Sequence, residues 1–322
     1  MMRDVYAGID IGGTNTVVGL FNEQMKLVMK SSFATAKPDR ITGAAPMLDR
    51  LADEVRRLAD DRSAGGRLRR VGIGVPGQID AVHGIVREAS NLGWHDVHLA
   101  AEMKKRLNVP VAIEHDVRSY AKGEAAGGAG KGCRNLICLT IGTGIAAAIM
   151  ADGAMVRGAN GLAGEFGHDI VDGETAPCSC GKSGCLETIA SATGIARLAE
   201  ELVLAGRIPD LAARSGSITA QEVYQACMRG DKDARTLFER VGTLIGRKLA
   251  GLVYALDPEM IIVGGGVAAA GDLLLEPIRQ ELGRHCPHQA SYLKVSAAQL
   301  GDEAGLIGAL HTGLAGDERV DM

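Results

Sequence analysis

Residues 5–22, VYAGIDIGGTNTVVGLFN, form two apolar runs separated by a Gly-Gly turn. The length of the runs and their β-branched residues predict two strands that meet at the turn. Residues 135–152, NLICLTIGTGIAAAIMAD, follow the same plan, and aligning the two turns places Asp10 opposite Thr140. A repeated strand–glycine–strand unit predicts two related α/β domains with a cleft between them.

Strand and helix patterns alternate over the rest of the chain, which indicates α/β layers and not a β-sandwich or a helix bundle. We expect further strands at 26–35, 69–77, 109–114, 259–266 and 291–299, and helices at 42–60, 96–107, 192–206, 219–230, 234–256 and 302–314. The first of these helices has an apolar face made of Met47, Leu48, Leu51, Val55 and Leu58.

The composition is that of an ordinary soluble globular protein, with 46% hydrophobic and 23% charged residues. The net charge of −4 gives no reason to expect nucleic acid or a membrane as a partner. No apolar run approaches the length of a membrane span, and the N-terminus MMRDVYAGID lacks the organisation of a signal peptide. We therefore expect a cytoplasmic protein.

The segment DIGGTN, residues 10–15, has the composition of a phosphate-binding turn. Its two glycines can turn consecutive backbone N–H groups toward an anion, its threonine adds a hydroxyl, and its aspartate can hold hydrated Mg²⁺. A plain hairpin turn explains the glycines equally well. The second turn repeats the Gly-Thr pair, which favours phosphate, since one turn from each domain can then face a polyphosphate across the cleft. The candidate phosphate ligands are Asp10, Gly12, Gly13, Thr14, Gly142, Thr143 and Gly144.

Other glycine-rich segments are less informative. GGAGKGC at 127–133 and Gly181-Lys182-Ser183 each lack part of the Walker A pattern, so no P-loop is expected. VGGGVAAAG at 263–271 contains G-x-G-x-x-A after a predicted strand. No clear second βαβ unit is predicted after it, which argues against a dinucleotide-binding fold.

The segment GEFGHDIVDGETAPCSCGKSGCLE, residues 164–187, contains the donors of a metal site: His168, Cys178, Cys180 and Cys185. Three thiolates and one imidazole suit tetrahedral Zn²⁺, and four protein ligands close the shell, so the metal should be structural. The alternative is a buried histidine beside incidental cysteines, which the C-x-C-x4-C spacing disfavours. A metal would also rigidify the flanking Glu165 and Glu187. Four cysteines with apolar neighbours are expected to be buried, unpaired thiols: Cys133, Cys138, Cys227 and Cys286.

In VPVAIEHDVRSYAKGE, residues 109–124, a predicted strand ends at three polar residues and a helix follows. Asp116, the last of the three, can be the N-cap of that helix and accept a backbone N–H. It can also be a reactive carboxylate at the carboxyl end of a strand, where α/β proteins bind ligands. The two roles are compatible, because a capping carboxylate keeps one oxygen free.

Taken in order, DIGGTN, GVPG, NLGW, E-x-D before a helix, GTG, GEFGH, CSCGKSGCLE and GLIGA resemble the motifs of the ROK family. The resemblance extends from about residue 5 to residue 310, and the signature H-x9-C-x-C-G-x2-G-C-x-E is complete from His168 to Glu187. It implies the actin-like, ribonuclease-H-type ATPase fold and phosphorylation of a hexose at its 6-hydroxyl, with glucose as the default substrate. It also implies ATP with Mg²⁺, a structural zinc and a homodimer.

The resemblance assigns residue roles motif by motif. It makes Asp116 the catalytic base, which accepts the proton of the sugar hydroxyl as that oxygen attacks the γ-phosphoryl group in line. It places the two Gly-Thr turns at the phosphates, and it places Gly264, Gly265 and Gly266 near the adenosine. The residues that it assigns to the sugar hydroxyls are Gly77, Asn91, Glu165, His168 and Glu187, with His168 also a zinc ligand.

The expected organisation is a small α/β domain and a large one. The small domain covers residues 1–116 and is completed by a C-terminal helix at about 303–322. The large domain covers residues 117–302 and carries the zinc-binding loop. ATP and polyphosphate both remain open as the phosphoryl donor, and a dimer and a tetramer both remain open as the assembly.

The chain departs from the family pattern at two places. The family motif Glu-Asn-Asp is Glu114-His115-Asp116 here. A neutral imidazole offers its donor and its acceptor on opposite edges of a larger ring than an amide does. We expect His115 to contact the sugar, so an ordinary glucokinase and a kinase for an amino sugar, N-acetylmannosamine, allose, fructose or a cyclitol both stay open. At the second turn, Ala146 and Ala147 replace glycine and are expected to narrow the turn.

The same family includes DNA-binding repressors, which carry a helix-turn-helix domain ahead of the first phosphate turn. Only nine residues precede Asp10 in this chain, so we expect a kinase and not a repressor. A sugar sensor without catalysis is a lesser alternative, and the presence of both Asp10 and Asp116 argues against it.

Overall fold

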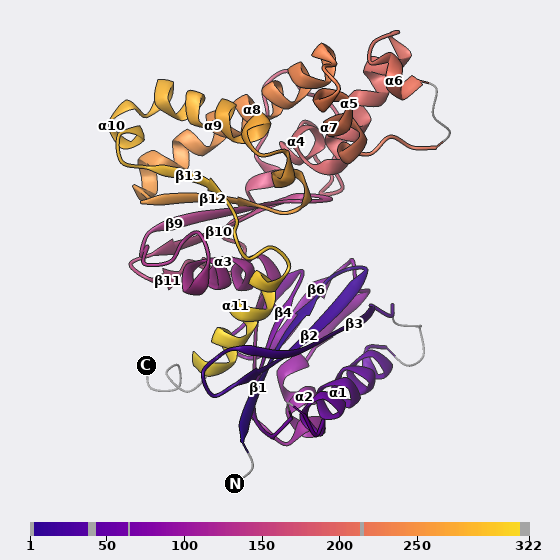
Figure 1. The fold of residues 1–322 in the computed structure, drawn as a ribbon, viewed down its shortest axis with the longest axis vertical. Coiled ribbons are helices and arrows are strands. Elements are labelled where there is room, and N and C mark those ends of the chain that lie inside the picture. Colours follow the sequence, from indigo (N-terminus) through magenta and orange to yellow (C-terminus); the bar gives the residue numbers. More distant parts are fainter. Residues whose placement is uncertain (1–2, 38–42, 64, 213–215, 316–322) are drawn as a thin grey trace. The chain divides into compact units, whose positions relative to one another are not determined.

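The computed structural model describes residues 3–37, 43–63, 65–212 and 216–315 (Figure 1). The chain forms two compact units, each with its own hydrophobic core. Unit 1 contains Met1–Gly132, Arg157–Leu162 and Asp302–Met322, and unit 2 contains Cys133–Val156 and Ala163–Gly301.

Each unit is built on a five-stranded sheet, and the two sheets have the same strand order. The unit 1 sheet has the order β3-β2-β1-β4-β8, with β1 (Asp4–Ile11), β2 (Asn15–Asn22), β3 (Leu27–Ala34), β4 (Arg67–Val75) and β8 (Val111–His115). The unit 2 sheet has the order β11-β10-β9-β12-β13, with β9 (Leu136–Ile141), β10 (Ile145–Ala151), β11 (Ala154–Met155), β12 (Met260–Gly264) and β13 (Lys294–Ala297). In both sheets the first three strands are antiparallel neighbours and the last two run parallel to the first strand. The predicted α/β class and the internal repeat are confirmed.

The two halves of the repeat differ by one residue at their turns. Ile11 pairs with Thr16, whereas Ile141 pairs with Ile145, so the first turn is one residue longer. Asp10 and Thr140 occupy matching strand positions, as the alignment predicts. When the two strand–turn–strand units are aligned on their first strands, the residues after the second turn are therefore offset by one position from those after the first turn.

The two faces of the unit 1 sheet carry different residues, because side chains alternate along a strand. Apolar side chains such as Ile9, Ile73 and Ile113 form a core with α1 (Ala45–Ala59) and α2 (Leu99–Leu107). The predicted apolar face of α1 is buried in this core, at Met47, Leu48, Leu51, Val55 and Leu58.

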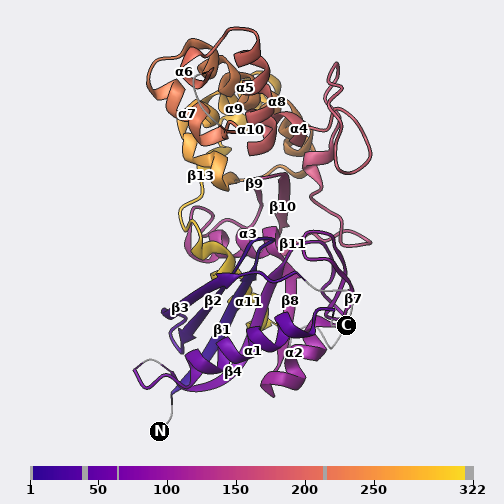
Figure 2. The ribbon, with the colours of Figure 1, turned by 90° about the vertical axis from the view of Figure 1, so that its right-hand side faces the viewer.

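The opposite face has glycine where α3 (Asp116–Gly127) and α11 (Glu303–Leu314) approach. A Cβ atom on Gly72 would overlap the carbonyl group of Ala309, and one on Gly308 would overlap the backbone of Ser119. Figures 1 and 2 show α11 beside α3. Helix α3 therefore belongs to unit 1, whereas a boundary at residue 116 assigns it to the second domain.

Helices make up most of the remainder of unit 2. They are η1 (Phe166–His168), α4 (Glu187–Ala190), α5 (Ala192–Leu204), α6 (Pro209–Ala212), α7 (Ala220–Met228), α8 (Lys232–Leu256), η2 (Gly266–Ala270), α9 (Asp272–His285) and α10 (Pro287–Ala290). The side chain of Asp231 accepts the amides of Asp233 and Ala234, both at 2.9 Å, and so fixes the start of α8.

Two features were not anticipated from the sequence. Unit 1 contains a three-stranded sheet of β5 (Gln78–Asp80), β6 (Ile85–Ala89) and β7 (Trp94–Val97). In unit 2, a helix that was not predicted, α9, lies in sequence between the parallel strands β12 and β13, so the glycine-rich segment after β12 lies inside a single βαβ unit. Pro277 inside α9 weakens the helical pattern and explains the omission. Across the described residues, every helix is too short or too polar to span a lipid bilayer.

Candidate active site

The parallel strands of unit 1 end at one edge of the sheet, and the polar candidates gather there. Asp10 of β1 is in register with Gly74 of β4, and Gly74 with Glu114 of β8. Because Gly74 has no side chain, neighbouring groups approach it closely. A Cβ atom built on it would lie 3.1 Å from Ser119 Oγ and 3.6 Å from Asp10 Oδ1. The Asp10 carboxylate is thus held between the sheet and the two helices that cover it.

The Asp10 carboxyl has a strongly perturbed acidity. Burial raises the pKa of Asp10 to about 7, and the charges of Asp116 and Asp302 act in the same direction. Motif analysis does not identify Asp302, since only the packing of α11 on β1 brings it near Asp10. A half-buried carboxylate beside two others would be stabilised in its ionised form by a divalent cation.

The first Gly-Gly turn is fastened by Thr35. The Thr35 hydroxyl donates to the carbonyl of Gly12 at 2.8 Å, and its amide donates to the carbonyl of Thr14 at 2.8 Å. A buried hydroxyl, that of Thr16, lies 2.8 Å from the Thr35 hydroxyl. These carbonyls are therefore bound within the protein and do not face a ligand. An anion-binding turn requires that its carbonyl oxygens point away from the anion in this way.

Two predicted sugar ligands lie near this turn and the small sheet. A Cβ atom on Gly13 would lie 3.5 Å from Asn91 Cβ, so the structure brings Asn91 to the first phosphate turn. Gly77 follows β4 with a φ of 109°, and any side chain there would overlap the backbone of β6 at Glu88. A close approach and a left-handed backbone conformation together require glycine at this position.

Asp116 is the first residue of α3, and the N-cap is His115. The predicted N-cap position of Asp116 is therefore wrong by one residue, although its Oδ1 does accept a backbone N–H, that of Val117 at 2.7 Å. His115 Nδ1 lies 3.3 Å from Val117 N and 3.1 Å from Asp116 Oδ1. Unprotonated, this nitrogen accepts from Val117, and protonated, it donates to Asp116. In both states Nδ1 is used within the protein.

Glu114, the first residue of the same motif, is fully buried and faces three cations. Its carboxylate lies 2.5 Å from Arg157, 3.3 Å from Lys122 and 3.4 Å from Arg118. Burial opposes its ionisation, but the charges of Lys122, Arg157 and Arg118 prevail and lower the pKa of Glu114 to about 2. Glu114 is therefore an ionised structural centre, and the motif analysis gave it no role.

The second turn, Gly142–Gly144, is fastened by the start of α5. The amide of Ala192 donates to the Gly142 carbonyl at 2.8 Å, and the Thr193 hydroxyl donates to the Thr143 carbonyl at 2.9 Å. A Cβ atom on Gly144 would lie 2.9 Å from Glu187 Oε2, so this predicted sugar ligand lies beside the turn.

The two alanines expected to narrow the second turn lie in the strand that follows it. Ala146 and Ala147 belong to β10, where Ala146 pairs with Thr140 and the Ala147 amide donates to the Gly164 carbonyl at 2.8 Å. The glycines at 264–266 follow β12. A Cβ atom on Gly265 would lie 2.5 Å from the Ile141 carbonyl oxygen, which places this segment directly beside the second turn.

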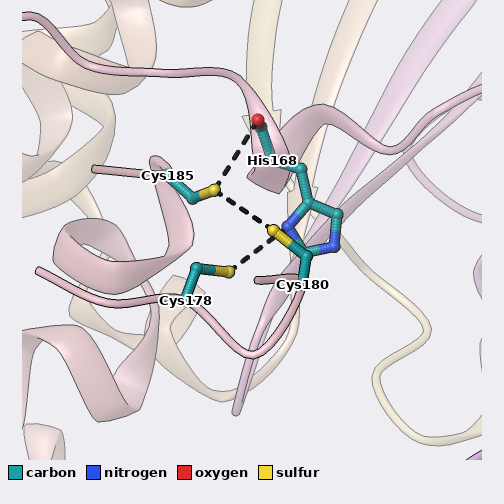
Figure 3. A group of neighbouring side chains, drawn as sticks. All are labelled: His168, Cys178, Cys180 and Cys185. Carbon is teal, nitrogen blue, oxygen red and sulfur yellow. Dashed lines mark hydrogen bonds between the residues drawn. The ribbon is translucent and has the colours of Figure 1, made fainter. Parts of the chain in front are cut away.

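The four predicted zinc ligands come together in unit 2 (Figure 3). The ligand atoms of His168, Cys178, Cys180 and Cys185 all lie within 4.8 Å of one another. His168 Nδ1 is 3.6 Å from Cys178 Sγ, and Cys180 Sγ is 3.6 Å from Cys185 Sγ. Of the other cysteines, Cys138, Cys227 and Cys286 are buried as expected, whereas Cys133 is half-buried.

The carboxylates predicted to contact sugar flank this cluster. Glu187 Oε1 lies 3.6 Å from His168 Nδ1 and accepts from the Cys178 thiol at 3.0 Å. Glu165 Oε2 lies 3.6 Å from His168 Nε2. The imidazole thus presents Nδ1 to the cysteines and Nε2 to the side of Glu165, so the two expected roles of His168 use different nitrogens.

The whole chain is similar to known proteins. Residues 6–314 match the model of the ROK family. A glucokinase from Halalkalibacterium halodurans is 38% identical over 309 residues, which cover 94% of this chain and 93% of that protein. A ROK family glucokinase from Streptomyces griseus, solved in complex with glucose and AMPPNP, superposes with a TM-score of 0.79 at 32% identity, covering 96% of this chain and 99% of that one. The Escherichia coli transcriptional repressor Mlc is 29% identical over 94% of this chain and 74% of its own length.

These similarities agree with the observed fold. The chain therefore belongs to the ROK family and has its actin-like ATPase fold. Its similarity to glucokinases over nearly their whole length makes it a sugar kinase of that family.

Replacing Asp10 with Asn should stabilise the protein in magnesium-free buffer. The pKa of about 7 in the folded protein lies above the ordinary aspartate value of 3.8. The ionisation penalty therefore appears as the pH rises past 3.8, grows up to about 7 and is constant above that. Urea unfolding between about pH 4 and about pH 8 should show the stability gain of Asp10→Asn increasing over this range. An equal gain at both ends would contradict the perturbed acidity.

Proposed function

We propose that the protein transfers the γ-phosphoryl group of ATP to the 6-hydroxyl of a hexose, with glucose as the default substrate. The observation that carries the proposal is the position of Asp116. It stands at the carboxyl end of β8 beside the half-buried Asp10, in a chain similar to glucokinases over nearly its whole length. The proposal assigns residues of both units to one reaction.

Asp116 is the proposed general base. A sugar hydroxyl is a poor nucleophile, so its proton must be accepted as the oxygen attacks phosphorus. Oδ1 of Asp116 is engaged by the Val117 amide, and Oδ2 is the oxygen that we assign to the proton. Because Oδ1 is fixed in the first turn of α3, the carboxylate is oriented before the substrate binds.

The two fastened turns are the proposed phosphate ligands. Gly13 and Thr14 offer their amides and one hydroxyl in unit 1, and Thr143 and Gly144 do so in unit 2. The amides of Gly12 and Gly142 close these turns by donating to the carbonyls of Asn15 at 2.9 Å and of Gly144 at 3.0 Å. Next to the second turn, Gly264, Gly265 and Gly266 are assigned to the adenosine. In support, the segment that follows these glycines lines a pocket of about 710 Å³, at Ala269, Ala270 and Gly271.

Asp10 is the proposed ligand of a hydrated Mg²⁺, which it would bind through the water molecules of the metal's hydration shell. The residues fit the ion, because burial and the charges of Asp116 and Asp302 leave a carboxylate that a divalent cation would stabilise. When bound, Mg²⁺ neutralises charge on the phosphate groups.

His168, Cys178, Cys180 and Cys185 are the proposed ligands of a structural Zn²⁺, and their spacing fits a tetrahedral site. With Zn–S of about 2.3 Å and Zn–N of about 2.0 Å, two sulfurs lie about 3.8 Å apart, and sulfur and nitrogen about 3.5 Å. The observed separations are both 3.6 Å. Such a centre would hold Glu165 and Glu187 in place.

The sugar hydroxyls are assigned to Gly77, Asn91 and His115 in unit 1 and to Glu165, His168 and Glu187 in unit 2. Support comes from the orientation of His168, whose Nε2 is directed away from the cysteines and can bind a hydroxyl. We also propose a homodimer, with a tetramer as the alternative, which sedimentation velocity of the full chain would distinguish.

A coupled phosphorylation assay tests the proposed activity. Glucose, glucosamine, N-acetylmannosamine, allose, fructose and cyclitols should be offered with Mg-ATP and, separately, with polyphosphate. We expect turnover with ATP and the highest kcat/KM for glucose. Absence of phosphorylation on every acceptor with both donors would refute the proposal and favour a non-catalytic sugar sensor or a repressor.

Asp116→Asn should fold and bind sugar but lose phosphorylation by about 10²- to 10⁴-fold, the usual contribution of a general base. Sugar binding can be followed through Trp94, the single tryptophan of the sequence, which is buried three residues after Asn91. Near-normal turnover in the variant would remove Asp116 from the base role.

His115→Asn restores the family motif and should change the ranking of acceptors. An imidazole whose Nδ1 is used within the protein presents only Nε2 to a substrate, whereas an amide presents a donor and an acceptor close together. We expect the kcat/KM for glucose to rise in the variant relative to the values for an amino sugar, N-acetylmannosamine, allose, fructose and a cyclitol. The same ranking in both proteins would show that His115 does not select the sugar, and would favour an ordinary glucokinase.

Cys180→Ser should lose zinc and loosen the segment between Glu165 and Glu187, because a three-ligand site binds the metal far more weakly. Elemental analysis of the purified protein measures the metal, and limited proteolysis measures the loop. Cys133→Ser, a half-buried cysteine outside the cluster, is the matched control. Wild-type protein without zinc would refute the ligand assignment.

A further inference from the structure

The short segment Arg157–Leu162 has an unusual place in the chain. It is flanked in sequence by Cys133–Val156 and by Ala163–Gly301, which both belong to unit 2, yet its own contacts place it in unit 1. Five residues of this segment, 157–161, also line a cavity of about 460 Å³ together with residues 78–83 and Arg87. One residue that lines this cavity, Gln78, is next in sequence to the proposed sugar ligand Gly77.

Both ends of the segment are bound. The Arg157 guanidinium donates to Glu114 Oε2 at 2.5 Å. Arg118 donates to the carbonyl of Gly161, and a Cβ atom on Gly161 would lie 2.9 Å from the Ile79 carbonyl oxygen. Three residues later the Gly164 carbonyl accepts the Ala147 amide of β10 at 2.8 Å. The proposed sugar ligand Glu165 follows directly, so little free chain separates it from these attachments.

The pairing of Arg157 with Glu114 is not explained by charge neutralisation. Arg118 and Lys122 already lie within 3.4 Å of this one buried carboxylate, so Arg157 adds a third positive charge. Its Nε is buried and has no hydrogen-bond partner among the described residues, which is a cost that proteins rarely accept. A role in holding the segment Arg157–Leu162 in place accounts for both the third positive charge and the unpaired Nε, since the Arg157 guanidinium would then be kept at Glu114 for the position that it gives the chain.

We propose that Arg157 is a positioning residue for the sugar site: by binding Glu114 it fixes the segment Arg157–Leu162, and with it the approach of the chain to Glu165. Glu114 is two residues from Asp116, so one ion pair joins the segment leading to a sugar ligand to the strand end that carries the base. This inference rests on the proposed sugar-kinase function.

The test compares Arg157→Gln, Arg157→Lys and the control Arg69→Gln. Arg69 is an exposed arginine of the same unit that pairs with Asp4 at 3.3 Å. For Arg157→Gln we expect faster amide hydrogen exchange across residues 157–165 and a sugar KM raised roughly tenfold, with the ATP KM and the melting temperature equal to those of the control. Arg157→Lys keeps the charge but not the planar fork, so it should recover part of the sugar KM.

Two outcomes would overturn the inference. One is unchanged exchange and unchanged sugar KM in Arg157→Gln. The other is an equal rise of both KM values together with a lower melting temperature, which would mean a general structural role. Hydrogen exchange does not depend on turnover. An inactive wild-type protein would therefore contradict the proposed function, while the exchange data would still decide whether Arg157 fixes the segment.

Discussion

The arrangement of unit 1 depends on the close approach of α11 and α3 to a sheet face that has no side chains in the way. Gly72 meets the Ala309 carbonyl and Gly308 meets Ser119, at separations that leave no room for a Cβ atom. Because α11 comes from the end of the chain and β1 from its start, this contact also ties Asp302 to Asp10. A methyl group on either glycine would move the helix, and with it the carboxylates that line the strand ends.

On the same face of the sheet, the pKa values of two neighbouring acids are shifted in opposite directions. Asp10 and Glu114 are separated in register only by Gly74; Glu114 is buried and Asp10 is half-buried. Two other carboxylates face Asp10, and its pKa is raised to about 7, whereas Lys122, Arg157 and Arg118 surround Glu114 and lower its pKa to about 2. Burial penalises both charges, so the sign of the neighbours decides. One acid is left as a site that a cation would stabilise, and the other is an internal anchor.

Local patterns were sufficient for most strands of the two main sheets, for most long helices and for the cysteine cluster, because strand period, helix period and metal-ligand spacing are all short-range properties. They could not give the one-residue offset between the two turns, which depends on how Thr16 and Ile145 pair across strands. Nor could they show Asp302 beside Asp10 or Arg157 on Glu114, since those contacts join distant parts of the sequence. The N-cap of α3 also does not follow from residue preferences, because aspartate is among the most favoured N-caps, whereas here the imidazole of His115 occupies that position.

That cap explains why a histidine can stand where the family motif has asparagine. An amide oxygen and an imidazole Nδ1 are attached at comparable distances from the backbone, so either can serve the first turn of a helix. In this chain Nδ1 lies between the Val117 amide and the Asp116 carboxylate, and α3 begins at the residue expected for the base. The exchange therefore leaves the helix start and the orientation of Asp116 intact. The exchange of asparagine for histidine changes only the part of the side chain that is not bound to α3. In His115 this part is larger than in asparagine and carries a single nitrogen, Nε2. On the proposed function, the consequence of His115 falls on the choice of substrate and not on the transfer step.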